Sequence, residues 1–175
     1  MPRLEMDLNP VTSITTDAIG KPGERVFYLQ ARQEEKVVTL LIEKIQIQSL
    51  AVGVDQFLDE IKKKYPDLPE PREDFLESEM HIEPPVDPLF RVGEIGLGYD
   101  QENDLMVLVA REATTEGSDP EEGGVVRFWC SRSQIRALVN WGGEVVSHGR
   151  PICPQCGEPM DPEGHFCPKK NGHKK

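Results

Sequence analysis

The chain has 175 residues, of which 37% are hydrophobic, and this size suits one domain with a small appendage. Its formal net charge of −11 disfavours general binding of nucleic acid, because such binding needs basic side chains to neutralise phosphates. No stretch approaches the ~20 apolar residues of a membrane span, and no apolar signal segment follows the N-terminus. We therefore expect a cytoplasmic protein whose four cysteines are reduced, ligated or buried rather than joined in disulfides.

Three strands are predicted in the first part of the chain. Residues 1–10 are polar and are expected to be loose, whereas residues 11–18 alternate weakly between apolar and polar, which is typical of an edge strand. Residues 25–32 are rich in β-branched and aromatic side chains and predict a second strand. A nearly continuous apolar run over residues 37–42 predicts a third, central strand, because such runs suit burial on both faces.

A helix and a linker follow these strands. From Gln46, apolar side chains recur at steps of three and four, which predicts one buried helix face. The helix is expected to end near Tyr65, because Pro66 disfavours helical backbone in the residue before it. Residues 66–89 are rich in proline and acidic side chains and predict a linker that either covers the body or floats free, with room for a short helix over Asp74–Met80.

The second part of the chain shows the same order of elements. Residues 90–97 and 105–112 predict two hairpin strands, residues 114–124 form an acidic loop, and residues 125–130 predict a third strand.

A second helix is predicted directly after this strand. Ser131 and Gln134 fit a capping box, in which each side chain accepts a hydrogen bond from the other residue's backbone amide. Gly142-Gly143 is expected to end the helix, and Val145-Val146 predicts a short final strand.

Two recurring motifs indicate an internal duplication. Leu29-Gln30-Ala31-Arg32 matches Leu108-Val109-Ala110-Arg111, and the stretches beginning at Val37-Val38 and Val125-Val126 each lead into a Gln-Ile pair. We therefore predict an α+β fold in which a β-β-β-α unit occurs twice and forms antiparallel sheets with two packed helices, followed by a zinc-knuckle-like segment. The expected divisions are a first half at 1–65, the linker at 66–89, a second half at 90–149 and the tail at 150–175.

The duplication suggests a site between the two halves. Arg32 and Arg111 occupy matching positions, as do Gln46 and Gln134, so both pairs are candidates to line a shared cleft. Two arginines in a cleft would suit an anionic ligand. The simpler alternative is that Arg32 and Arg111 pair with surface carboxylates at the ends of their strands.

The C-terminal cysteines predict a zinc site. Cys153 and Cys156 form a Cys-x-x-Cys pair followed by glycine, and His165 and Cys167 lie two residues apart, so both side chains point the same way on an extended strand. These four ligands suit tetrahedral Zn²⁺, and a closed set of four leaves no position for a reacting water, so the metal is expected to be structural. His173 is a rival fourth ligand, and a redox-active or free thiol pair is the alternative to zinc.

Other candidate residues have simpler interpretations. Cys130 is expected to be a small buried thiol, His81 a solvated side chain in the linker, and His148 a surface histidine. The basic tail Lys169–Lys175 is expected to aid solubility, although zinc knuckles with basic flanks also bind single-stranded nucleic acid.

The stretch Pro22-Gly23-Glu24-Arg25-Val26-Phe27-Tyr28-Leu29-Gln30-Ala31-Arg32 and the motif Cys153-Pro154-Gln155-Cys156 with Asp161-Pro162-Glu163-Gly164-His165-Phe166-Cys167-Pro168 resemble a bacterial family known as domain of unknown function 3090. The resemblance spans nearly the whole chain. It implies that the residues at 153, 156, 165 and 167 are typical, whereas the position of His173 is usually not histidine. It therefore favours His165 as the ligand, and it implies no reaction.

The sequence favours a non-enzymatic zinc-binding adaptor or protein-binding module whose partner is another protein. An enzyme or small-molecule sensor that binds an anionic ligand between the halves, at Arg32 and Arg111, is the first alternative. Binding of single-stranded nucleic acid through Lys169–Lys175 is a weaker alternative.

Overall fold

The computed structural model describes residues 4–20, 24–72, 75–84, 86–114, 117 and 123–147. Its elements in chain order are β1 (Glu5–Leu8), β2 (Ser13–Ile19), β3 (Val26–Gln33), β4 (Lys36–Ile42), α1 (Lys44–Lys64), the 3₁₀ turn η1 (Glu77–Glu79), β5 (Val92–Asp100), β6 (Leu105–Glu112), β7 (Val125–Cys130) and α2 (Arg132–Ser147).

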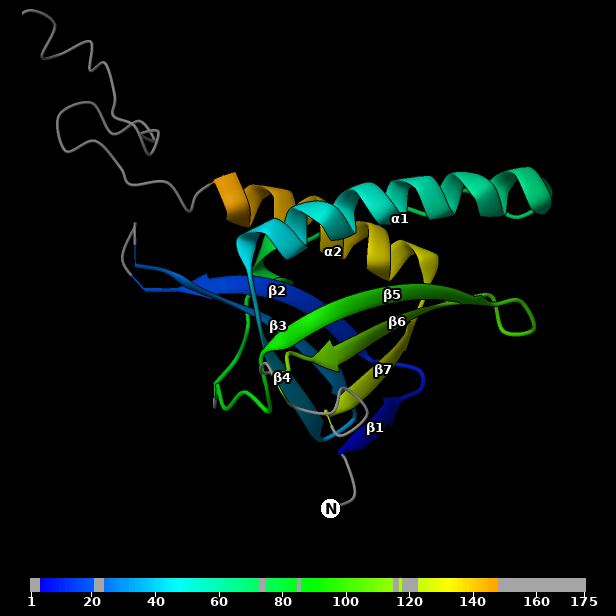
Figure 1. Cartoon of the computed structure of the whole chain (residues 1–175). Coiled ribbons are helices and arrows are strands. Elements are labelled where there is room, and N and C mark those ends of the chain that lie inside the picture. The colour runs from blue at the N-terminus through cyan, green and yellow to red at the C-terminus, as the bar shows by residue number, and fades with distance from the viewer. Residues whose placement is uncertain are drawn as a thin grey trace, which may run out of the picture.

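Two sheets lie beneath two helices. β2, β3 and β4 form an antiparallel sheet in that order, and β5, β6 and β7 form a second one in the order β7-β6-β5, with β1 added parallel to β7. The two helices cross the same side of the molecule next to each other (Figure 1). The predicted α+β class is confirmed, and none of the described helices combines the length and apolar composition that crossing a membrane requires.

Apart from the additional strand β1, both halves run strand, strand, strand, helix, and each helix is tied to the start of the corresponding hairpin in the other half, at β5 or just before β2. Gln46 at the start of α1 donates from Nε2 to the backbone oxygen of Val92 at 2.9 Å. Gln134 at the start of α2 donates in the same way to the oxygen of Thr12 at 3.2 Å. These two glutamines therefore hold corresponding places, while the common origin of the halves stays a prediction.

The helix starts and the buried face of α1 follow the sequence prediction. The Gln134 backbone N–H donates to Ser131 Oγ at 2.9 Å, and the Ser131 N–H donates to Gln134 Oε1 at 2.8 Å, which completes the predicted capping box. α1 ends at Lys64, directly before Tyr65 and Pro66. Its buried side chains all belong to the predicted face: Ile47, Leu50, Val54, Leu58 and Ile61.

The predicted end of α2 at Gly142-Gly143 and the strand at Val145-Val146 are wrong. The helix continues through both glycines to Ser147, and the two valines are buried helical residues. A Cβ at position 142 would lie only 2.9 Å from Cγ2 of Ile47 on α1. Close packing between the helices therefore requires this glycine and outweighs its poor helix propensity.

The expectation that residues 1–10 are loose is wrong for residues 5–8. Residues 5–8 form β1, which pairs in parallel with β7, and Leu8 is completely buried. Four residues are too few for a reliable alternation, so the strand depends on a partner more than a hundred residues away.

The linker covers the outer face of the β2-β3-β4 sheet. Gln30 is only 3% exposed; its Nε2 donates to the backbone oxygen of Glu83 and its Oε1 accepts from the Glu83 N–H, both at 3.0 Å. Thr15 on β2 donates to the oxygen of Met80. In place of the short helix expected over 74–80, only the turn Glu77–Glu79 is formed.

Candidate functional site

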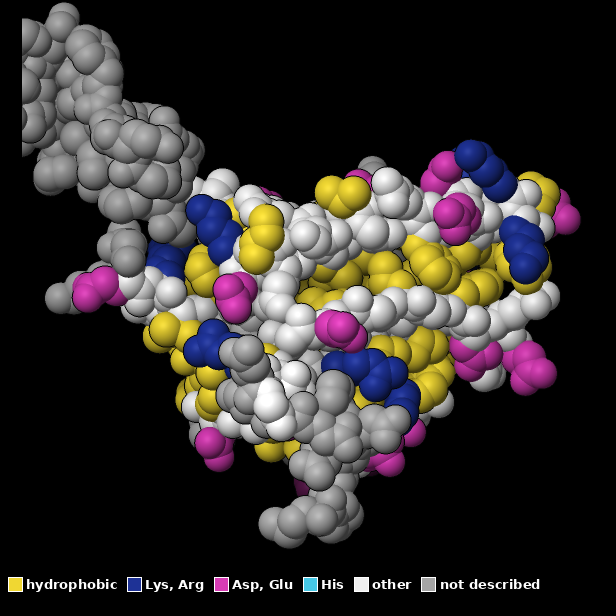
Figure 2. Space-filling view, viewed as in Figure 1, with side chains coloured by type: hydrophobic (Ala, Val, Ile, Leu, Met, Phe, Trp, Pro, Cys, Tyr) yellow, Lys and Arg dark blue, Asp and Glu magenta, His cyan; other side chains and the backbone are white. Residues whose placement is uncertain are grey.

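An apolar groove runs between α1 and β5. Its first hollow has a volume of about 280 Å³. Figure 2 shows hydrophobic side chains gathered in the furrow between the two elements. The residues that line this hollow, which we call the α1–β5 groove, are Ile45, Gln46, Ser49, Leu50, Gly53, Gly93, Ile95 and Leu97.

The groove is open because α1 carries a glycine where it faces β5. A Cβ at Gly53 would lie 3.6 Å from Cδ1 of Leu97, so an alanine would be tolerated but a large side chain would fill the space. Leu97 and Ile95 are consequently only half-buried. Ile45, at the N-terminal end of the groove, is 62% exposed. Half-covered apolar side chains in a groove gain free energy when another apolar segment covers them.

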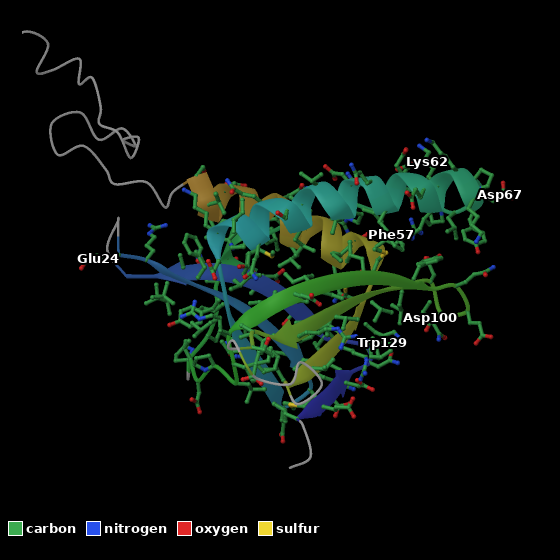
Figure 3. The ribbon with its side chains drawn as sticks, viewed as in Figure 1. Glu24, Phe57, Lys62, Asp67, Asp100 and Trp129 are labelled. Atoms are coloured by element: carbon green, nitrogen blue, oxygen red, sulfur yellow. The ribbon has the colours of Figure 1, made fainter. Side chains whose placement is uncertain are left out.

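A second hollow lies farther along the same two elements. It has a volume of about 370 Å³, and Phe57, Tyr65 and Tyr99 are among its lining residues. Figure 3 shows Phe57 on the side of α1 that lies over the second sheet. Glu60, Lys64 and Gln101 also line this hollow, so it is more polar than the α1–β5 groove.

β5 borders these hollows as the last strand of its sheet. Its described pairing is with β6 alone, over nine residues from Val92 to Asp100 with one irregularity near its start. Edge strands present unpaired backbone groups to which an extended peptide can add. An apolar groove beside such a strand is suited to an extended apolar segment.

A polar cluster closes the far end of β5 and fixes the start of α2. Arg132 is buried and donates from Nε and Nη2 to the two carboxylate oxygens of Asp104, at 2.8 and 3.1 Å, and from Nη1 to the backbone oxygen of Pro69 at 2.8 Å. Tyr99 donates to Asp104 Oδ1 at 2.6 Å. The hydrogen bond from Arg132 lowers the pKa of Asp104. Burial, followed by the bond to Asp104, raises the pKa of Tyr99 to about 12.

The Tyr99 shift predicts a change in stability at high pH. Because its folded pKa of about 12 lies above the ordinary value of about 10, the stabilising contribution is complete below pH ~10 and is lost as the pH rises through ~12. Ultraviolet titration of tyrosinate should show a late step in the native protein that Tyr99→Phe removes. Asp104→Asn should move that step only partly, because burial is the larger cause, and a wild-type step that survives in Tyr99→Phe contradicts this assignment.

A mixed-charge pocket lies beside this cluster, between the two helices and residues 68–71. Its volume is about 320 Å³, and three acidic and three basic side chains line it. Lys62 pairs with Glu70, and Arg132 pairs with Asp104. These ion pairs balance the charge, so the pocket has no preference for one sign of ligand.

The predicted zinc ligands Cys153, Cys156, His165 and Cys167 lie outside the described residues, as do the rival His173, His148 and the tail Lys169–Lys175. Within the described ranges, no three His, Cys, Asp or Glu side chains cluster closely enough to hold a metal ion. The zinc site therefore stays a prediction that rests on the C-terminal motif.

The two arginines of the predicted cleft lie in different sheets. Arg32 on β3 pairs through Nη2 with Glu83 of the linker at 3.0 Å, which is the simpler of its two interpretations. Arg111 on β6 is exposed. Neither Arg32 nor Arg111 lines any of the four pockets described for this part of the chain. The shared arginine cleft stays a prediction.

The remaining candidates, Cys130 and His81, make contacts that stabilise the fold. Cys130 is completely buried, as predicted, and burial raises the pKa of its thiol to about 12, far from the range of a nucleophile. His81 is 52% exposed but is not merely solvated: its Nδ1 lies 2.9 Å from Asp17 Oδ2, and its ring packs edge-on against Trp141.

The α1–β5 groove was missed from the sequence, although one signal pointed to it. Ile45, which lines the groove, lies off the buried face of α1 and is 62% exposed. An apolar side chain exposed outside the buried face of a helix is a weak indication of an interaction surface.

Comparison with known proteins places the whole arrangement in one family. No curated protein and no solved structure matches the chain. The family model described as "Protein of unknown function (DUF3090)" matches residues 6–167. The matched range contains both halves of the fold and all four predicted zinc ligands, and it leaves out His173. The chain therefore belongs to the DUF3090 family.

Proposed function

We propose that the protein is a protein-binding module rather than an enzyme, and that it carries a structural zinc ion in its C-terminal segment. The observation that supports binding is the α1–β5 groove: a half-covered apolar surface beside an edge strand. Such a site takes an extended segment of a partner protein, whose backbone pairs with β5 while alternate side chains enter the groove.

The zinc ion is supported by ligand chemistry and spacing. Three thiolates and one imidazole, from Cys153, Cys156, Cys167 and His165, form a closed tetrahedral set of the kind that stabilises short segments. Binding free energy of the metal would then fold a segment that is too short to fold alone.

Metal analysis tests the zinc proposal. The purified protein is expected to contain about one zinc ion per chain, and changing Cys153 and Cys156 together to serine should remove it. Cys130→Ala is the matched control, since it deletes a thiol outside the motif and should leave the metal in place. Metal-free protein with a disulfide between Cys153 and Cys156 would contradict the proposal.

Selection from a random library of linear peptides tests the groove. Enriched peptides are expected to be extended and rich in alternating apolar residues. Leu97→Thr removes apolar contact area while keeping a strand-forming residue, so it should weaken their binding about tenfold. Val107→Thr is the control, because Val107 lies on β6 next to the core residue Leu108 and faces the other side of the same sheet. Equal losses in both variants, or no enriched peptide, would refute binding in the groove.

A further inference from the structure

We propose that the α1–β5 groove is occupied in the resting protein by the chain's own C-terminal segment, residues 148–175. This inference rests on the proposed function insofar as it names the resting occupant of the same groove. It is carried by a comparison between the two halves of the fold, because the corresponding groove in the other half is already filled.

The two grooves correspond residue by residue. Thr16 on β2 pairs with Leu29, and Leu97 on β5 pairs with Leu108, so Thr16 and Leu97 hold matching places in their sheets. On the helices, Trp141 follows Gln134 by seven residues, and Gly53 follows Gln46 by seven residues.

Trp141 and the linker fill the groove between α2 and β2. The indole of Trp141 is 3% exposed, and its Nε1 donates to the backbone oxygen of Thr16 at 2.7 Å. Phe75 of the linker packs edge-on against the indole with ring centres 5.8 Å apart, and Met80 joins the same buried cluster. At the matching place in the other half, Gly53 leaves the hollow beside Leu97 uncovered by described residues.

The order of the chain identifies the matching cover. The linker that covers the α2–β2 groove is the segment that follows α1. The segment that follows α2 is residues 148–175, which are 28 residues long. An extended chain advances about 3.3 Å per residue, whereas α1 rises only about 1.5 Å per residue over its 21 residues. The segment can therefore span far more than the length of α1.

The segment also starts in the right place and has suitable chemistry. Ser147 and Val146, at the end of α2, line a hollow of about 450 Å³ together with Lys44 and Ile47 near the start of α1, and the groove begins at the adjacent Ile45. The segment offers apolar side chains at Ile152, Met160 and Phe166. Its five basic and three acidic residues give a formal net charge of +2, which the proposed zinc ion with its three thiolates lowers to +1. Residues 1–147 carry a formal net charge of −13. Opposite charges favour docking on the body.

A partner segment would then have to displace the C-terminal segment. Docking within one chain operates at a high effective concentration, so it lowers the apparent affinity of any competing peptide. Leu97→Thr weakens the docked segment as well as the peptide, so the loss of about tenfold in peptide binding given above applies to an open groove, and a docked segment makes the loss in the full chain smaller. The zinc ligands lie in the docked segment, and metal binding would thereby be coupled to access to the groove.

Site-specific photo-crosslinking in the full chain tests this occupancy. A benzophenone amino acid replaces Ser49, which lines the α1–β5 groove. The expected product has the mass of one chain and joins position 49 to a residue between 148 and 175. The same probe at Ala137, the matching position on α2, is the positive control and should reach the linker around Phe75 and Met80. A product that joins two chains, or no link from position 49 to the segment, overturns the proposal.

Hydrogen exchange provides a second measurement without a bulky probe. Leu97→Thr in the full chain is expected to speed amide exchange within residues 148–175 about tenfold, by weakening the docked state, whereas Val107→Thr should not. Unchanged exchange in both variants overturns the inference. If selected peptides bind the groove but the segment neither crosslinks nor responds to Leu97→Thr, the inference fails and the proposed function stands; if no peptide binds either, both fail.

Discussion

Gly142→Ala is expected to lower the free energy of unfolding by about 1–3 kcal/mol, although alanine is the better helix former. The new Cβ would lie 2.9 Å from Cγ2 of Ile47 and 3.3 Å from Cγ2 of Thr16. Both neighbours are β-branched and stiff at χ1, so neither methyl group can move away without disturbing its own element. The helices would separate slightly, and buried contacts would be lost along their shared face.

Gly143→Ala is the matched control for this prediction. It lies in the same turn of α2, but a Cβ there would meet nothing within 4 Å. Alanine should therefore raise the free energy of unfolding by up to about 1 kcal/mol, through helix propensity alone. Denaturant unfolding followed by circular dichroism measures both variants. Shifts of the same sign in the two would show that packing at Gly142 does not limit how closely the helices approach.

Gln30→Leu is expected to destabilise the protein by about 2–4 kcal/mol and to release the linker. The Gln30 amide donates to Thr39 Oγ1 at 3.1 Å and to the Glu83 oxygen at 3.0 Å, and its carbonyl accepts from the Glu83 N–H at 3.0 Å. Leucine has a similar size but satisfies none of these groups. The Glu83 N–H and backbone oxygen would lose their partners on the sheet, and the linker would detach there.

Limited proteolysis and denaturant unfolding test this prediction together. Gln30→Leu should be cleaved faster within residues 80–84 than the wild type. Glu83→Ala is the control, because it removes only the exposed ion pair with Arg32 and keeps the backbone bonds to Gln30; its effect should stay within about 1 kcal/mol. Unaltered cleavage in Gln30→Leu would mean that the linker is held by other contacts, such as those of Met80.

Features governed by local patterns were predictable from the sequence. The spacing of Ile47, Leu50, Val54, Leu58 and Ile61 identified α1 and its buried face. The pair Ser131 and Gln134 located the start of α2, because a capping box involves only neighbouring residues. Apart from β1 and the strand wrongly expected at Val145-Val146, the order of strands and helices followed in the same way, and with it the α+β class.

Features that depend on distant contacts were not predictable. β1 forms because β7 offers an edge, and α2 continues past Gly142 because α1 packs against that glycine. The α1–β5 groove exists because position 53 is glycine opposite Leu97, and this opposition becomes visible only when the packing of α1 against β5 is known. The zinc motif is local to the chain, and it stays a prediction from its ligands and spacing.

The way in which each helix bonds to the opposite half bears on how the chain folds during synthesis. Thr16 receives its bond from Trp141, and the start of β5 receives its bond from Gln46. A nascent chain that has left the ribosome only as far as α1 still lacks the helix that covers its own β2. Folding must therefore wait until residues 132–147 have emerged, and until then the first sheet exposes an apolar face to chaperones and to aggregation.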